Sequence, residues 1–336
     1  MTTRAVHATY ATQPSDPLLG TGRRILRAVA LAATVPYLTL KTAWLAGSRV
    51  GIPAGSVLNE PGPFFTVANS VTLAMDACVI LLVLVLTRPF GRRVPSWLLS
   101  VPCFFATGLL TPILLGFPGQ LLVRAMGFGA DEAARAVRKP FLDPWVFNVV
   151  YTGFTLQGLA LAGLFVPYAR ERWSARWRGV QGPGVAPDGG RGRFPSSTGV
   201  MAGAAAATGL AVAAVHAYWA FGGTAWLSAE QAAAYSADTA VVSAVHGWCA
   251  LAAGAGALLL ARGGGLGARW PLGIAWIGSG AALSWGTWML IAALGPQLDG
   301  GEGPTGAILL AYAGQMITGL LSAAVLMGFL TARRAP

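Results

Sequence analysis

Eight long apolar runs constrain the fold of this chain more than any other feature. They cover approximately residues 25–47, 66–88, 95–116, 145–168, 199–221, 239–261, 270–294 and 305–331. A run of about 20 apolar residues matches the hydrocarbon core of a bilayer, which is roughly 30 Å thick. Because a backbone in lipid must satisfy its own hydrogen bonds, each run is predicted to be a helix. The predicted fold class is therefore all-α, a polytopic integral membrane protein with eight transmembrane helices.

The composition also favours a membrane protein over a soluble one. Only 10% of the 336 residues are charged, whereas soluble domains have about 25%. The net charge of +11 would suit a nucleic-acid partner, but the basic residues cluster at the ends of the apolar runs. We therefore expect no nucleic-acid partner and expect the lipid bilayer instead. The three cysteines lie inside apolar runs without a CxxC motif, so no metal site is predicted.

The distribution of charge predicts how the chain is oriented. Arginines gather near both termini and in the loops after the second, fourth and sixth runs, and most acidic residues lie in the other loops. The positive-inside rule then places both termini in the cytoplasm, and we expect the bacterial cytoplasmic membrane as the location. Residues 119–141 mix apolar and charged residues near helical spacing. They predict a helix on the outer membrane surface, with a substrate lid as the alternative.

Short correspondences between the two halves predict an internal duplication. The motif TAWLAG, Thr42–Gly47, ends the first span, and TAWLSA, Thr224–Ala229, ends the fifth. Three weaker correspondences follow in the same order along the chain. Because each copy has an even number of spans, the copies are parallel repeats. The predicted domains are a first four-helix repeat at 1–168, a Gly/Pro/Arg-rich cytoplasmic linker at 169–198 and a second repeat at 199–336.

Two charged residues inside the predicted spans form the first candidate site. Lys41 lies fourteen residues from Arg27, and Asp76 lies twelve residues from Arg88. At about 1.5 Å per residue, the two depths differ by roughly 3 Å. Since an unpaired charge in the membrane interior is costly, we predict an interhelical ion pair of Lys41 with Asp76. Its role is either to fix the two spans together or to act in function; alternatively, Lys41 extends outward to the membrane surface.

Two histidines form the second candidate site. His216 and His246 lie in the outer halves of the fifth and sixth spans, and the short loop between these spans makes them neighbours. Such a pair suits bis-histidine haem ligation, a quinone site or a metal site, whereas a hydrogen-bonded helix contact is the simpler interpretation. Aromatic residues predict a pocket around the pair. The candidate ligand-binding residues are His216, His246, Tyr218, Trp219 and Trp248.

The stretch containing His216 also resembles a known family. His216-Ala-Tyr218-Trp219 followed by Gly222-Gly223 is similar to the His-x-Tyr-Trp-x-x-Gly-Gly stretch of small four-span bacterial membrane proteins, the domain of unknown function 3995. The resemblance covers the second half of the chain, from the fifth span to the C-terminus. It implies a helical membrane fold and no particular activity.

The sequence favours a non-enzymatic function. It contains no GxSxG, HExxH or Walker motif, so we predict binding or transport of a small apolar or amphipathic molecule. One alternative is a haem- or quinone-associated membrane redox component that uses the two histidines. The other is a membrane scaffold for a protein partner.

Overall fold

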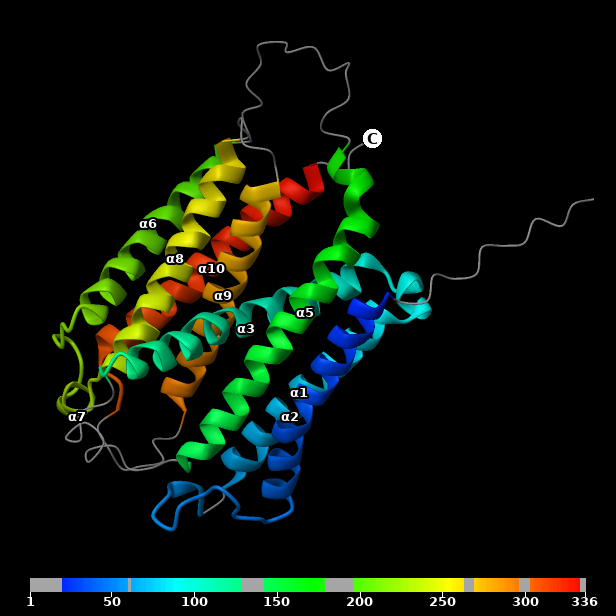
Figure 1. Cartoon of the computed structure of the whole chain (residues 1–336). Helices are drawn as coiled ribbons and strands as arrows, with labels where there is room; N and C mark the ends of the chain where they lie inside the picture. The colour runs from blue at the N-terminus through cyan, green and yellow to red at the C-terminus, as the bar shows by residue number, and fades with distance from the viewer. Residues whose placement is uncertain are drawn as a thin grey trace, which may run out of the picture.

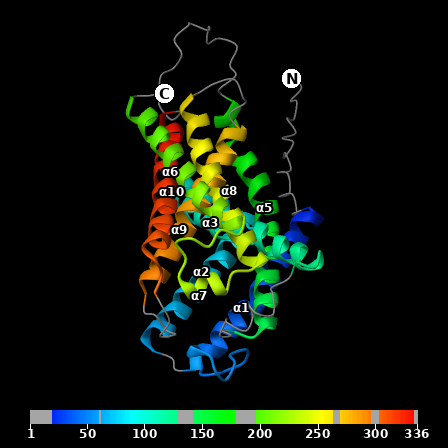
Figure 2. The ribbon, with the colours of Figure 1, turned by 90° about the vertical axis from the view of Figure 1, so that its left-hand side faces the viewer.

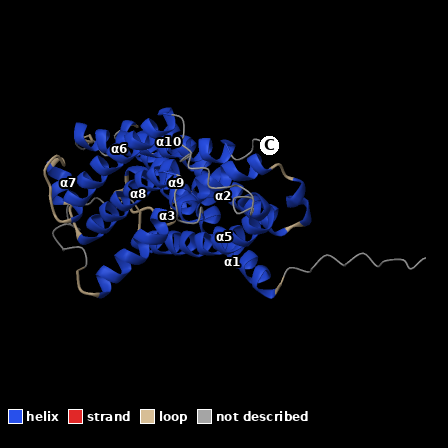
Figure 3. Cartoon of the chain, turned by 90° about the horizontal axis from the view of Figure 1, so that it is seen from above, coloured by secondary structure: helices blue, strands red, loops and turns tan. Residues whose placement is uncertain are grey.

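The chain is an all-α polytopic membrane protein with eight long apolar helices. A computed structural model describes residues 20–59, 62–128, 142–178, 196–262, 269–295 and 303–332. Within these residues there is no strand (Figure 3). The long helices are α1 (Thr21–Leu45), α2 (Pro63–Thr87), α3 (Ser96–Ala125), α5 (Pro144–Arg178), α6 (Ser196–Ala220), α8 (Ala237–Arg262), α9 (Arg269–Leu294) and α10 (Gly306–Ala332). Each is long and apolar enough to cross a membrane.

The surface of the helices shows which solvent they require. Large apolar side chains are exposed along their length, for example Leu81, Leu210 and Leu310. Only 22% to 50% of each candidate span is buried against other helices. An apolar surface of this extent is unstable in water, so these side chains contact the lipid bilayer.

Two helices run further than the sequence predicts. α5 continues as far as Arg178, so the predicted linker at 169–198 begins inside a helix, and residues 179–195 lie outside the described residues. An ion pair between Arg23 and Glu171 joins α1 and α5 beyond their apolar parts. α3 likewise includes 119–125 of the predicted surface helix, and 129–141 lie outside the described residues.

The helices form two groups that meet at α3. α6, α8, α9 and α10 pack on one another as one bundle, while α1, α2 and α5 pack together beside them. α3 crosses obliquely between the groups, where it packs against α5 on one side and against α8 and α9 on the other (Figures 1 and 3). We call the side of the bundle where α1, α3, α6 and α9 end the distal side. The opposite side, where α1 begins and α10 ends, is the proximal side (Figure 2).

The two groups use different packing chemistry. Between α1, α2, α3 and α5 the buried residues are mainly large, such as Leu82, Leu99 and Leu164. Between α6, α8, α9 and α10 small residues predominate, and several glycines lie directly against a neighbouring backbone. A Cβ added to Gly256, for instance, would lie 2.5 Å from the Cα of Ala275. Small residues allow helix backbones to approach closely in a membrane, so this second group is tightly packed.

The ends of α1 and α6 are built alike. Trp44 and Trp219 each lie one residue before the last residue of their helix, and each indole N–H donates to a carbonyl six residues further on. Three residues after each tryptophan stands a glycine with positive φ, 91° at Gly47 and 92° at Gly222. They are typical helix ends in which glycine adopts the left-handed conformation without strain.

This match changes the correspondence expected from the repeated TAWL letters. Trp226 of the second TAWL follows the end of α6, is exposed and has a positive φ of 68°, whereas Trp44 of the first is buried inside α1. The structural counterpart of Trp44 is therefore Trp219, seven residues earlier. Seven residues are about two helical turns. The offset between the two alignments is therefore close to a whole number of turns, which explains why aligning the TAWL letters still matched residues on a similar helical face. With this offset, Lys41 corresponds to His216 rather than to Gly223.

Candidate functional site

The two histidines of the bundle interior lie side by side. His216, four residues before the end of α6, and His246, nine residues into α8, have ring centroids 5.6 Å apart and ring planes only 22° apart. The edge of Trp219 packs on His216 at 5.3 Å, and Trp285 of α9 packs on His246 at 5.6 Å. Both histidines are more than nine-tenths buried. His216 and His246 are thus neighbours, as the short connection between α6 and α8 predicts.

A glutamine from a third helix completes this cluster. Gln315 of α10 is fully buried, and its Nε2 lies 2.9 Å from Nδ1 of His246. As placed, the amide donates to the ring nitrogen, so the neutral His246 carries its proton on Nε2. We name His216, His246 and Gln315 the histidine cluster. Sequence reasoning missed Gln315, although a glutamine inside an apolar span is itself a signal because burying its amide is costly.

The histidine cluster contains polar atoms without partners. Both ring nitrogens of His216 and Oε1 of Gln315 are buried without a hydrogen bond. A neutral imidazole always offers one donor and one acceptor. Leaving each such group unsatisfied costs about 1–3 kcal/mol, and buried polar groups in proteins normally have a partner. The cluster therefore has the hydrogen-bonding capacity to hold a polar group.

Two predicted ligand-binding residues lie away from this cluster. Trp248 is 65% exposed and Tyr218 is 42% exposed, with the Tyr218 ring packed on Trp226 instead. Each follows a histidine by two positions, and two residues turn a helix by about 200°. They therefore face away from the histidines, so their inclusion in the site is corrected. Trp219, which follows His216 by three positions, is part of the surroundings.

The predicted ion pair of Lys41 with Asp76 is not formed. The Lys41 Nζ donates to Oδ1 of Asn69 at 2.7 Å and lies 5.1 Å from the ring centroids of both Tyr37 and Trp44. Asp76 instead accepts from Nε2 of Gln157 on α5, at 3.0 Å. Lys41 and Asp76 thus each have a partner of their own.

The reference points used for the depths explain this correction. Arg27 lies six residues inside α1, whereas Arg88 follows the end of α2 directly, so the two flanks are at different depths. The proximal ends of the helices, Thr21 of α1 and Thr87 of α2, are the better reference. At about 1.5 Å per residue, Lys41 lies roughly 30 Å from its proximal end and Asp76 roughly 16 Å from its own. This difference of about 14 Å is too large for an ion pair.

The first group of helices has a polar pair in the place of the histidine cluster. Asp76 and Gln157 lie equally far from the distal ends of α2 and α5, at roughly 20 Å along each helix. His246 and Gln315 are likewise level, at roughly 14 Å from the distal ends of α8 and α10. Each group thus joins its second and fourth spans by a residue paired with glutamine. Measured along its own helices, the Asp76–Gln157 pair lies about one helical turn further from the distal ends.

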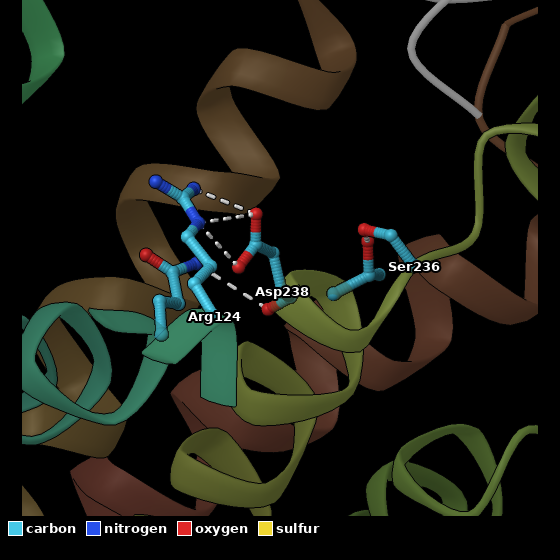
Figure 4. Close-up of polar contacts among 5 residues, drawn as sticks. Arg124, Ser236 and Asp238 are labelled. Atoms are coloured by element: carbon cyan, nitrogen blue, oxygen red, sulfur yellow. Dashed lines mark hydrogen bonds and ion pairs between the residues drawn. The ribbon is translucent and has the colours of Figure 1, made fainter. Parts of the chain in front are cut away.

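A salt bridge ties α3 to α8 at the distal side. Nη2 of Arg124 lies 2.6 Å from Oδ2 of Asp238, and Nε of Arg124 donates to both carboxylate oxygens (Figure 4). Gln120, one turn earlier on α3, donates to the backbone carbonyl of Asp238. Nearer the membrane centre, the Trp285 indole donates to the carbonyl of Leu109. The two helix groups are thus joined by directional contacts as well as by apolar packing.

The described residues provide no ready metal centre. They contain no group of three or more His, Cys, Asp and Glu side chains placed to hold a metal ion. Cys103 and Cys249 are buried as free thiols and Cys78 is exposed.

Comparison with family models, with curated proteins and with solved structures found no match. The histidine cluster and the Asp76–Gln157 pair are therefore interpreted from their own chemistry.

Proposed function

We propose that this integral membrane protein binds the polar end of a small amphipathic molecule at the histidine cluster. The observation that carries the proposal is the buried set of unpartnered atoms, both ring nitrogens of His216 and Oε1 of Gln315. Together they provide one N–H donor and two acceptors within an otherwise apolar interior. A hydroxyl group can accept from the N–H and donate to one of the acceptors, whereas a carbonyl group accepts from the N–H alone.

The surroundings favour an uncharged polar end. Within the described part of the chain, the two ion pairs found are Arg23–Glu171 and Arg124–Asp238, and neither includes a residue of the cluster. A charged headgroup would need an opposite charge in this buried place. The rings of Trp219 and Trp285 against the histidines suit a flat group such as a quinone or a phenol.

A binding experiment on the purified protein in lipid nanodiscs tests this proposal. The probe is a short-chain benzoquinone, with an alkylbenzene of equal chain length as the apolar control, and binding is followed by quenching of tryptophan fluorescence. We expect saturable quenching by the quinone alone, with an affinity at least tenfold weaker in His216→Leu. The matched control Tyr218→Phe, two residues away on the lipid-facing side, should bind like the wild type.

Two outcomes would overturn this proposal. Equal quinone affinity in the wild type and in His216→Leu would show that the histidine cluster does not bind the probe. A Soret band that is lost in His216→Leu would assign the pair to haem and favour the redox alternative.

Two further proposals concern the whole chain. We infer a tandem duplication, which the matching ends of α1 and α6 and the polar pair in each helix group support. As part of this proposal, the second half resembles the four-span bacterial family through His216, Tyr218 and Trp219. We also propose a bacterial cytoplasmic membrane with the proximal side in the cytoplasm, which the arginines near that side support.

A further inference from the structure

Asp76 is an acid in the middle of a membrane-spanning helix. It lies near the centre of α2, between Pro63 and Thr87, and it is only 4% exposed. An unpaired charge at such a depth costs at least a few kcal/mol. The other acids of the described segments, Asp143, Glu171, Glu230 and Asp238, lie near or beyond the ends of the long helices.

The groups that face Asp76 provide no positive charge. Among the described residues Asp76 takes part in no ion pair, and Lys41 of α1 is held by Asn69, seven residues nearer the distal side. From α1, Tyr37 interacts with Asp76 and with Tyr151 of α5. On α3, the buried titratable group is the Cys103 thiol. An ionised Asp76 would therefore have neutral neighbours only.

The hydrogen bonds of the pair show what is missing. Nε2 of Gln157 donates to Oδ1 of Asp76, while Oδ2 of Asp76 and Oε1 of Gln157 are both buried without a partner. In an ionised carboxylate and an amide, these two remaining atoms are both acceptors. Both atoms belong to the carboxyl and amide groups that this hydrogen bond joins, and two acceptors cannot satisfy each other. One hydrogen added between them supplies a donor to both.

We propose that Asp76 and Gln157 form a proton-binding site in which Oδ2 of Asp76 carries the proton and donates it to Oε1 of Gln157. The carboxylic acid and the amide then share two hydrogen bonds in a closed ring, and the pair has no net charge. Release of the proton breaks the second hydrogen bond and leaves a charge in the membrane interior. The ligand of this site is a single proton, so the site needs no relay of further acids.

This site is independent of ligand binding at the histidine cluster. It belongs to the other helix group and shares no residue with the cluster. The two sites are alike in architecture, because each joins a second and a fourth span through glutamine. They differ in charge, since the first carries an acid where the second carries histidine.

Infrared spectroscopy with isosteric variants tests the proton directly. The protein in lipid at pH 7 should show the carbonyl band of a protonated carboxylic acid, and this band should be lost in Asp76→Asn. The control Asp143→Asn, at the residue directly before α5, should leave the band unchanged. Absence of a protonated-acid band at pH 7, or its persistence in Asp76→Asn, would overturn the proposal.

Thermal unfolding supplies a second measurement. An asparagine at position 76 offers an NH₂ donor to Oε1 of Gln157, so Asp76→Asn reproduces the closed ring. Because an unfolded aspartate is ionised at pH 7, the wild type must take up a proton when it folds, and Asp76→Asn, which needs none, should melt at or above the wild type. Asp76→Ala and Gln157→Leu should both melt several degrees lower, because each leaves a buried polar group unpaired. An Asp76→Asn protein that melts as low as Asp76→Ala would refute the ring.

The pH dependence has a defined sign. An unfolded aspartate loses its proton at about pH 3.9, whereas the folded pair keeps its proton, so the wild type should lose stability as the pH rises from about 4 until the folded pair itself releases the proton. Asp76→Asn lacks this titration and should lose less stability over the same range. Tyr37, Tyr151, Cys103 and Lys41 are present in both proteins, which cancels their titration in the comparison. Parallel pH profiles for the two proteins would contradict a protonated Asp76.

Discussion

The contact between the two helix groups makes a sharp prediction about one glycine. Gly108 of α3 lies directly against α9: a Cβ added there would lie closest to the carbonyl oxygen of Gly280, 2.5 Å from its carbonyl carbon and 2.6 Å from Oγ of Ser284. Ordinary contacts of a Cβ begin at 3.4 Å. Because the two nearest atoms belong to the α9 backbone, Gly108→Ala requires α3 and α9 to separate by about 1 Å at this point.

The magnitude follows from two opposing effects. Alanine in place of glycine favours a helix by about 1 kcal/mol, whereas overpacking a tight contact costs about 1–3 kcal/mol. A gap of about 0.5–1 Å between the helices also forfeits a quarter to a half of each dispersion contact. We expect Gly108→Ala to be net destabilising by about 1–2 kcal/mol.

Gly116 provides a matched control on the same helix. It has no atom within 4 Å of an added Cβ, so Gly116→Ala gains the helix preference without a clash and should be neutral or more stable. Thermal unfolding of both variants in the same detergent, followed by circular dichroism, measures the difference. The reasoning is refuted if Gly108→Ala melts at or above Gly116→Ala.

Three more contacts at the distal side give testable expectations. The Arg124–Asp238 salt bridge has an exposed arginine and a nearly buried aspartate. A double-mutant cycle of Arg124→Gln and Asp238→Asn should therefore give a coupling free energy of about 1 kcal/mol in unfolding experiments. Zero coupling would show that the pair does not join the helix groups. Ser228 and Gln231 form a reciprocal capping box on the short helix α7 (Ala229–Ala233). Ser228→Ala should lower the local stability of α7 by about 1 kcal/mol and so speed its amide hydrogen exchange. Unchanged exchange would contradict the role of the cap. The Tyr235 hydroxyl donates to the Trp219 carbonyl at the end of α6, at 2.6 Å; Tyr235→Phe should lower stability by about 1 kcal/mol, and an unchanged melting temperature would exclude that contribution.

The sequence predicted the helices well because their signal is long and physically simple. A run of about 20 apolar residues has one stable form in lipid, and the eight predicted spans correspond to the eight long helices. The errors lie at the ends, where Arg178 of α5 and Ala125 of α3 extend beyond the apolar runs. Charged residues can continue a helix out of the membrane, so hydropathy alone does not mark where the helix ends.

Side-chain pairs were harder to predict than spans. The closeness of His216 and His246 followed from the short connection between two neighbouring helices, which fixes their relative depth. Lys41 and Asp76 were assigned from arginines that lie at unequal positions relative to their helices, and so the ion pair was wrong. Gln157 and Gln315 were not predicted as partners, because the sequence does not show which face of a fourth span meets the second.

The corrected alignment of α1 with α6 explains why the two helix groups differ in chemistry. It places Lys41 and His216 at equivalent positions, four residues before the ends of helices with matching tryptophan and glycine ends. Lys41 is partly exposed and cationic, and it meets the neutral Asn69 and two aromatic rings near the distal side. His216 is buried and meets a second histidine. A permanent charge is tolerated only near the membrane surface, whereas a neutral imidazole can be enclosed at the same helical position. The presence of histidine instead of lysine at this helical position therefore accounts for the enclosed polar cluster of the second group, whereas Lys41 of the first group stays near the distal side and out of reach of Asp76.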